Sequence, residues 1–264
     1  MTLEGNNVLH IQSRANPLIK QLRQLAHSSS AGRKQGRIWL EGDHLCRAAL
    51  AKGFLPEIAV FSSSNWPSAL CLPARAAIKM IVIPDTLMQD ISPLPSPAPV
   101  AFVLGLPEAP PALLPKAATV ILDRVQDAGN VGSILRSAAA FGFEQIIALQ
   151  GTAALWSPKV LRAGMGAHFA LRLIEGVQTS DLAQLNVPIV VTSSHQGLVL
   201  PGAQLPFPCA WAMGHEGQGV SEELLNLARH RVRIAQPGGE ESLNVAAAAA
   251  ICLYASFASI GQGK

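Results

Sequence analysis

The stretch that decides the fold is QPGGEESLNVAAAAAICLYASF, which runs from Gln236 to Phe257. A turn with two glycines and two glutamates leads into Ser242, Leu243 and Asn244, and the alanine-rich apolar run that follows predicts a helix. Ser242 or Asn244 is expected to cap this helix, because a short polar side chain accepts the free N–H groups of the first turn. The run is nearly apolar on every face, so it predicts a buried helix.

The composition is that of a globular protein with one large or two ordinary domains, since 49% of the 264 residues are hydrophobic and only 14% are charged. The N-terminal residues MTLEGNNVLHIQSR lack the pattern of a signal peptide, and no other part of the chain approaches the roughly 18 apolar residues of a membrane span. We therefore expect a cytoplasmic protein with no membrane partner.

The cysteines are widely spaced and form no CxxC pair, which indicates neither a disulfide framework nor a metal site. They are predicted to be small core residues: Cys46, Cys71, Cys209 and Cys252.

Basic charge is concentrated near the N-terminus. Residues 1–106 carry ten Lys and Arg against six Asp and Glu, whereas residues 107–264 carry ten against eleven. Between Arg14 and Arg37 there are six basic residues and no acidic one: Arg14, Lys20, Arg23, Arg33, Lys34 and Arg37. One interpretation is an ordinary solvated face. The other is a patch that contacts the phosphates of a nucleic acid.

The N-terminal half predicts a small α/β domain. A helix is expected from about Pro17 to His27, followed by a polar, flexible loop with the sequence SSSAGRKQGR, and then by short strands that alternate with helices. Repeated prolines after Ser92 disfavour both helix and sheet interior. They place one domain at residues 1–106, a proline-rich linker at 107–116 and a second domain at 117–264.

The C-terminal half predicts a mostly parallel sheet covered on both faces, because continuous apolar strands alternate with helices. Ligands of such sheets bind outside the carboxyl ends of the strands. Three glycine-rich loops lie there: DAGNVGS at 127–133, MGHEGQG at 213–219 and QPGGEESLN at 236–244. Taken singly these loops are weak signals: Asn130 could cap the next helix, Arg136 could be a surface arginine, and Glu216 could be a solvated turn residue.

The three loops in this order are specific. NVGSILR, then MGHEGQG, then PGGEESLNVAAAAA closely resemble the three signature motifs of the SpoU, or TrmH-like, branch of the SPOUT RNA methyltransferases, over about residues 117–264. RANPLIKQL and WLEGDHLCRAAL resemble the small α/β substrate-recognition domain that many members carry. The resemblance implies an α/β SPOUT domain with a C-terminal trefoil knot, a homodimer, and transfer of methyl groups from S-adenosylmethionine to ribose 2′-hydroxyls of structured RNA, either tRNA or rRNA.

The same resemblance assigns roles to residues. The catalytic set that it implies is Asn130, Arg136, Glu216, Ser242 and Asn244, and the cofactor-binding set is Thr192, Gly214, Ile234 and Leu243. Ala128, Ala235 and Gln236 depart from the family pattern, at positions expected to act through their backbone. Since a guanidinium group stays protonated in proteins, we expect Arg136 to grip a phosphate and stabilise developing alkoxide charge rather than act as a base.

Two other functions remain open at this point. A non-catalytic RNA-binding protein with a degenerate site would keep the basic patch, and a nucleotide-dependent oxidoreductase would need the GxGxxG motif that the chain lacks. The segment Ser157–Phe169 also resembles a family stretch, in which Lys159, Arg162 and His168 either face RNA or belong to a solvated basic helix.

Overall fold

The computed structural model describes residues 8–66, 77–106, 109–193, 197–200, 202–238 and 243–261. The chain divides into two compact units. One contains Met1–Glu108 together with Trp156–Phe169, and the other contains Ala109–Leu155 and Ala170–Lys264. The first unit thus includes a segment from the second half of the sequence.

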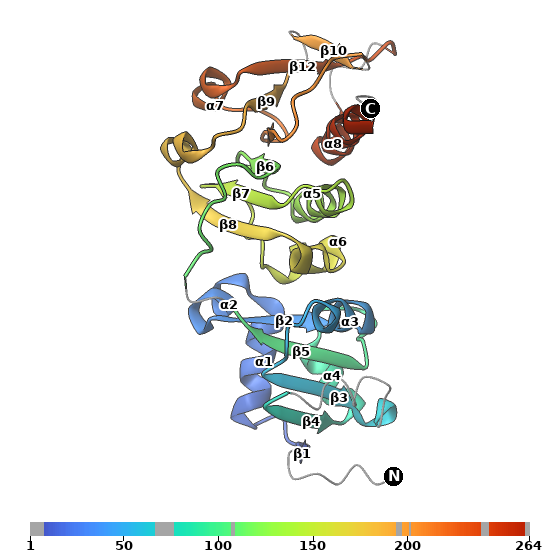
Figure 1. Ribbon diagram of the computed structural model, residues 1–264. Coiled ribbons are helices and arrows are strands. Elements are labelled where there is room, and N and C mark those ends of the chain that lie inside the picture. The colour runs from blue at the N-terminus through green and yellow to red at the C-terminus, as the bar shows by residue number, and fades with distance from the viewer. Residues whose placement is uncertain are drawn as a thin grey trace. The chain divides into compact units, whose positions relative to one another are not determined.

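The first unit is built on a five-stranded mixed sheet with the order β1-β4-β3-β5-β2 (Figure 1). Its strands are β1 (Val8–His10), β2 (Arg37–Glu41), β3 (Ile58–Ser62), β4 (Lys79–Ile83) and β5 (Val100–Gly105). Strand β5 is antiparallel to both β2 and β3. Successive side chains of β2 enter different cores: Ile38 and Leu40 pack on one face of the sheet and Trp39 on the other. The sheet is therefore covered on both faces.

The helices of this unit are α1 (Pro17–His27), α2 (Ser29–Gln35), α3 (Asp43–Ala51), α4 (Asp85–Ile91) and α6 (Pro158–Gly164), with the short 3-10 helices η1 (Ser63–Asn65) and η3 (Ala167–Ala170). Helices α1 and α4 supply one core, through residues such as Leu22 and Met88. Helices α3 and α6 supply the other, through residues such as Cys46 and Leu161.

The expectation of a flexible loop after α1 is wrong, because residues 29–35 form α2. The Ser28 side chain accepts a hydrogen bond from Ala31 N at 3.2 Å and so caps the helix start. Gly36 ends the helix in the left-handed conformation, with φ 62°. The capping residues at both ends therefore stabilise a helix in this short polar stretch, although it has no apolar stripe.

The second unit is a seven-stranded sheet with the order β10-β12-β9-β11-β6-β7-β8. Its strands are β6 (Thr119–Leu122), β7 (Gln145–Leu149), β8 (Arg172–Val177), β9 (Ile189–Thr192), β10 (Leu198–Leu200), β11 (Ala210–Met213) and β12 (His230–Ile234). Every neighbouring pair is parallel. The prediction of an α/β fold with a parallel sheet is confirmed. The carboxyl ends of all these strands meet at one edge.

The helices of this unit are α5 (Ala128–Ala140), α7 (Glu222–Leu227) and α8 (Val245–Gly261), with the 3-10 helix η4 (Thr179–Gln184). Helices α5 and α8 lie side by side (Figure 1). Sequence reasoning did not foresee the three-residue strands β1 and β10, because runs that short carry no clear alternation.

Helix α8 is not buried on every face, which corrects the expectation drawn from its composition. Ala249, Cys252 and Leu253 are buried, and Ser256 accepts a hydrogen bond from Trp211 Nε1 at 2.8 Å. On the other side, Tyr254 is 56% exposed and Phe257 is 51% exposed. One face of the helix thus packs on its own chain while another presents apolar side chains.

Cys46, Cys209 and Cys252 are buried, as expected, whereas Cys71 lies outside the described residues. Burial raises the pKa of the Cys209 and Cys252 thiols to about 12, so both stay protonated. Among the described residues, no group of His, Cys, Asp and Glu is arranged to hold a metal ion. Within the same residues, no helix has the length and apolar character needed to cross a membrane.

Candidate active site

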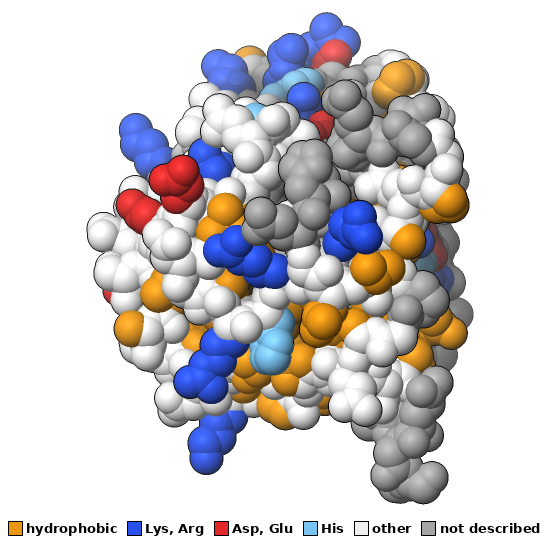
Figure 2. Space-filling model, turned by 90° about the horizontal axis from the view of Figure 1, so that it is seen from above, with side chains coloured by type: hydrophobic (Ala, Val, Ile, Leu, Met, Phe, Trp, Pro, Cys, Tyr) orange, Lys and Arg blue, Asp and Glu red, His pale blue; other side chains and the backbone are white. Residues whose placement is uncertain are grey.

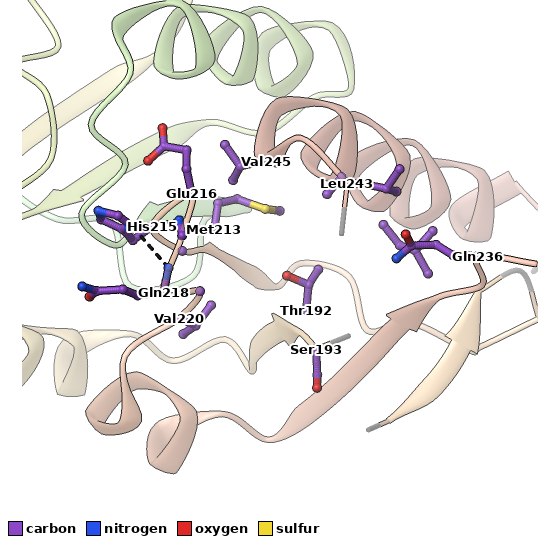
Figure 3. Close-up of a pocket in the computed structure, with 15 residues that line it drawn as sticks. Thr192, Ser193, Met213, His215, Glu216, Gln218, Val220, Gln236, Leu243 and Val245 are labelled. Atoms are coloured by element: carbon purple, nitrogen blue, oxygen red, sulfur yellow. Dashed lines mark hydrogen bonds between the residues drawn. The ribbon is translucent and has the colours of Figure 1, made fainter. Parts of the chain in front are cut away.

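A pocket of about 600 Å³ opens at the carboxyl ends of β9, β11 and β12 (Figure 3). All four residues expected to bind the cofactor line it: Thr192, Gly214, Ile234 and Leu243. The other lining residues are Ser193, Met213, His215, Glu216, Gly217, Gln218, Gly219, Val220, Gln236, Val245 and Ala248. The pocket thus combines apolar side chains with hydroxyl and amide groups, and most of the second glycine loop forms one wall.

This second glycine loop, residues 213–219, is held in shape by its own hydrogen bonds. His215 and Gly219 exchange backbone hydrogen bonds of 3.0 and 2.8 Å. The ring Nδ1 of His215 accepts from Gly217 N at 2.9 Å, and a dashed line in Figure 3 marks this contact. A Cβ on Gly214 would lie 2.2 Å from the backbone of Gly219 and Val220, so only glycine fits there. His215 therefore shapes the loop, through its backbone and its ring.

Glu216 ties this loop to the start of α5. Its carboxylate accepts hydrogen bonds from Gln126 N at 3.2 Å, Asp127 N at 3.0 Å and Asn130 Nδ2 at 3.1 Å. Burial of the Glu216 carboxylate raises its pKa, but the bonds from Asn130 and from these backbone N–H groups lower it more, to about 2. Glu216 is thus a permanent anion at neutral pH and a weak base.

Asn130 is free for this contact because Asp127, not Asn130, caps α5. The Asp127 carboxylate accepts from Asn130 N at 2.8 Å, and the helix begins at Ala128. This corrects the interpretation of Asn130 as the cap. With its backbone N–H satisfied by Asp127, the Asn130 side chain points its amide NH₂ at Glu216 and its carbonyl oxygen at Asn244.

Asn244 combines capping with membership of the site. Its Oδ1 accepts from Ala246 N at 2.9 Å and Ala247 N at 3.2 Å, which caps α8, while its Nδ2 donates to Asn130 Oδ1 at 2.9 Å. Three residues from three loops, Asn130, Glu216 and Asn244, therefore form one hydrogen-bonded chain. Ser242, the remaining polar residue of the third loop, lies outside the described residues.

Arg136 stands apart from this chain of contacts. It lies on α5 beyond Asn130, is exposed, and makes no hydrogen bond or ion pair with the part of the protein that the structure describes. Its guanidinium is thus available to an anionic ligand. The structure shows no contact between Arg136 and Asn130, Glu216 or Asn244.

The six basic residues of the first unit differ in availability. Arg14 and Arg37 are paired with the carboxylates of Asp90 and Glu57, at 2.5 and 2.7 Å. Lys20 and Arg23 lie one turn apart on the exposed face of α1, and Arg33 and Lys34 are exposed in the last turn of α2.

The segment 157–169 does not present all three of its predicted basic side chains. His168 is only 1% exposed and its ring packs against Trp156, with centroids 5.4 Å apart. A Cβ on Gly164 would lie 2.5 Å from the His168 ring, which shows how tightly the ring is enclosed. The alternative that His168 faces RNA is therefore wrong, whereas Lys159 is exposed and Arg162 is half-buried.

Sequence reasoning missed four contributors next to the site: Asp123, Arg124, Asp127 and Gln218. Asp123 and Arg124 follow β6 directly, so the rule that ligands bind beyond the carboxyl ends of parallel strands could have drawn attention to them. No local sequence pattern indicates that Arg124 adopts a positive φ of 60°.

Comparisons with known proteins agree with this geometry. The model of the SpoU rRNA Methylase family matches residues 117–254. An uncharacterised tRNA/rRNA methyltransferase of Synechocystis is 35% identical, over 94% of this chain and 93% of its own length. The 23S rRNA (guanosine(2553)-2′-O)-methyltransferase RlmP of Bacillus subtilis is 30% identical, over 92% and 97%.

Solved structures show the same fold. A putative RNA methyltransferase of the TrmH family from Porphyromonas gingivalis is 30% identical with a TM-score of 0.79, over 90% of this chain and 96% of that one. The AdoMet-bound rRNA methyltransferase of Sinorhizobium meliloti is 26% identical with a TM-score of 0.82, over 94% and 97%. The family model covers the residues of the pocket, and the two relatives match nearly the whole chain at 30% identity or more. The protein therefore belongs to the SpoU rRNA methylase family.

Proposed function

We propose that this protein methylates ribose 2′-hydroxyls of ribosomal RNA with S-adenosylmethionine as the methyl donor. The observation that carries the proposal is the pocket at the carboxyl ends of β9, β11 and β12, which gathers all four predicted cofactor residues beside the Asn130–Glu216–Asn244 chain. Family membership supports the reaction class. The ribosomal target is supported by relatives whose names specify 23S rRNA or rRNA.

The residues present fit the cofactor. Gly214, where a Cβ would clash with Gly219 and Val220, lets the second loop fold tightly on itself, and this loop forms one wall of the pocket. Ile234, Leu243 and Val245 supply apolar surface for a purine ring, and Thr192 supplies a hydroxyl near the opposite wall (Figure 3). S-adenosylmethionine supplies, when bound, an electrophilic sulfonium methyl group.

The chain's own residues position the acceptor. Glu216 is ionised at neutral pH and accepts three hydrogen bonds, so it holds the loop in place rather than taking the proton of the ribose hydroxyl. Arg136, whose guanidinium has no partner among the described residues, binds the RNA phosphate and stabilises negative charge on the attacking oxygen while the hydroxyl proton passes to water. Most of the rate enhancement then comes from fixing the hydroxyl at reacting distance.

The apolar face of α8 supports a homodimer. Ile251, Tyr254 and Phe257 are 41%, 56% and 51% exposed, and the rings of Tyr254 and Phe257 lie 5.7 and 6.2 Å from that of Phe141. In Figure 2, hydrophobic side chains gather in a band on the face seen from above, with basic side chains around it. A second copy of the chain would remove such a surface from water. The trefoil knot and the division into a recognition domain (1–106), a linker (107–116) and a catalytic domain (117–264) are parts of the same proposal, although residues 156–169 belong to the first compact unit.

The exposed cations of the first unit fit an RNA-binding role. Lys20, Arg23 and Lys34 carry no acidic neighbour in sequence, and Arg14 and Arg37 already have carboxylate partners. We assign phosphate contacts chiefly to the first three. Most phosphate contacts are thus assigned to the first unit, whereas the cofactor pocket and Arg136 belong to the second.

The decisive experiment incubates the purified protein with labelled S-adenosylmethionine and either rRNA or tRNA from cells that lack it, and then maps 2′-O-methyl groups. We expect methylation of one rRNA nucleotide and none of tRNA. Methylation of tRNA alone would overturn the ribosomal assignment. Absence of transfer to both RNAs, or transfer to a base, would overturn the proposed reaction.

A further inference from the structure

Arg124 has an unusual backbone conformation for its residue type. It follows the buried Asp123 at the end of β6 and has a φ of 60°, in the left-handed region that residues with a Cβ rarely adopt. Its N–H donates to Thr152 Oγ1 at 3.1 Å, and this hydroxyl donates to Leu122 O at 2.9 Å. The surroundings therefore hold Arg124 in this conformation, as is typical of residues with a functional constraint.

In this conformation, Asp123 and Arg124 together hydrogen-bond to the C-terminal end of the second glycine loop. Arg124 Nε donates to Asp123 Oδ1 at 3.0 Å, and the other carboxylate oxygen accepts from Ser221 N at 2.6 Å. The two terminal nitrogens of Arg124 donate to Gln218 Oε1 at 2.8 Å and Gly219 O at 3.4 Å. A single ion pair thus contacts residues 218, 219 and 221.

These hydrogen bonds complement those that Glu216 accepts. Glu216 fastens the middle of the loop to the start of α5, whereas Arg124 fastens Gln218 and Gly219 to the end of β6. Because Gly214 packs against the Gly219 backbone without space for a Cβ, a shift of Gly219 would be transmitted to Gly214 and so to the pocket wall.

Arg124 itself does not line this pocket. The Arg124 side chain is 33% exposed and that of Asp123 only 3%, but the Asp123 carboxylate keeps the hydrogen bond from Ser221 N when Arg124 is replaced, which limits the effect of such a substitution on the stability of the whole fold. The order of a loop that forms a binding wall, in contrast, affects affinity directly, because a disordered wall must lose conformational entropy when the ligand binds.

We propose that Arg124 is a positioning residue, which, through Asp123, Gln218 and Gly219, holds the second glycine loop in the conformation that receives S-adenosylmethionine. The inference rests on the proposed function. It assigns a role in cofactor affinity to a residue outside the three sequence motifs.

The test compares Arg124→Asn and Arg124→Lys with the wild-type full-length protein. Asparagine tolerates a positive φ but cannot span to Gln218 and Gly219, and lysine can reach Asp123 but lacks the fork of two further donors. Arg229→Ala is the matched control, since Arg229 is exposed and its side chain has no partner in the described part of the chain. The measurements are the Kd of S-adenosylmethionine by calorimetry, KM and kcat for methylation, and Tm.

We expect Arg124→Asn to raise both the Kd and the KM for S-adenosylmethionine about tenfold, with kcat at saturating cofactor and Tm close to wild type. Arg124→Lys should restore part of the affinity, and Arg229→Ala should leave it unchanged. Wild-type affinity in Arg124→Asn, or a parallel fall in Tm and kcat, would overturn this proposal alone. A wild-type protein that binds no S-adenosylmethionine would overturn the proposed function and this proposal with it.

Discussion

At the scale of single residues, the site depends on side chains that serve two neighbours at once. Asn244 caps α8 with its carbonyl oxygen and donates to Asn130 with its amide nitrogen. Asn130 in turn donates to Glu216. Each amide therefore has a fixed orientation, because exchanging its oxygen and nitrogen would break a bond on both sides.

Substitutions of Asn244 can separate its two functions. Asn244→Ala should lower the free energy of unfolding by about 1 kcal/mol, since it removes the cap of α8. Asn244→Asp keeps a good cap but loses the donor to Asn130, so stability should stay near wild type while kcat/KM falls on the order of 100-fold. Chemical denaturation and methylation kinetics measure the two effects. Equal activity in Asn244→Asp and wild type would show that the amide donor is dispensable.

The depressed pKa of Glu216 predicts a pH dependence. A carboxylate whose pKa falls from 4.5 unfolded to about 2 folded stabilises the protein fully above pH 4.5, and this contribution is lost as the pH falls toward 2. The stability difference between wild type and Glu216→Gln should therefore be constant from pH 5 to 7 and shrink below pH 4.5. Thermal unfolding of both proteins across this range measures it. A difference that grows toward low pH would contradict the assigned hydrogen bonds.

At the scale of elements, the sequence predicted the helices and strands whose apolar residues recur at a regular spacing or form a continuous buried run. It missed the helix whose ends are set by capping residues. Helix α1 spans Pro17–His27 as expected, and the parallel sheet of the C-terminal half forms as its continuous apolar strands predict. Helix α2 was missed because Ser28 and Gly36, rather than apolar residues, define its ends. The exposed face of α8 could not be inferred, because an all-apolar helix looks the same whether its own chain or a partner covers it.

The exposed face of α8 predicts a change in assembly. Tyr254→Asp places a charge in the patch with Phe257 and Phe141, so we expect a dimer to dissociate, with sedimentation at the mass of one chain, 27.8 kDa. Leu227→Asp on α7 is the control, because Leu227 is also an exposed apolar residue, at 45%. Analytical ultracentrifugation separates the outcomes. Identical masses for the wild type and Tyr254→Asp would refute α8 as the dimer face.

At the scale of the whole molecule, the sequence predicted where the pocket lies but not how it is held together. All four cofactor residues carried over from the family line one pocket, although no spacing rule by itself relates Thr192 to Leu243. The contacts made by Asp127 and Arg124 depend on which strands are neighbours, for example β6 beside β11. Such neighbours are set by tertiary structure, which single-sequence patterns do not contain.

The separation of cofactor pocket and basic surface predicts that RNA affinity can be changed alone. The triple variant Lys20→Glu, Arg23→Glu, Lys34→Glu should bind rRNA at least tenfold more weakly, and its slope of log affinity against log salt should be smaller by about 2.7, because three phosphate contacts are lost. Its Kd for S-adenosylmethionine should not change, since the pocket belongs to the other unit. Lys52→Glu, an exposed lysine of the same unit, is the control for a change in net charge. Filter binding across a salt series measures affinity and slope together, and an unchanged slope in the triple variant would show that RNA contacts the protein elsewhere.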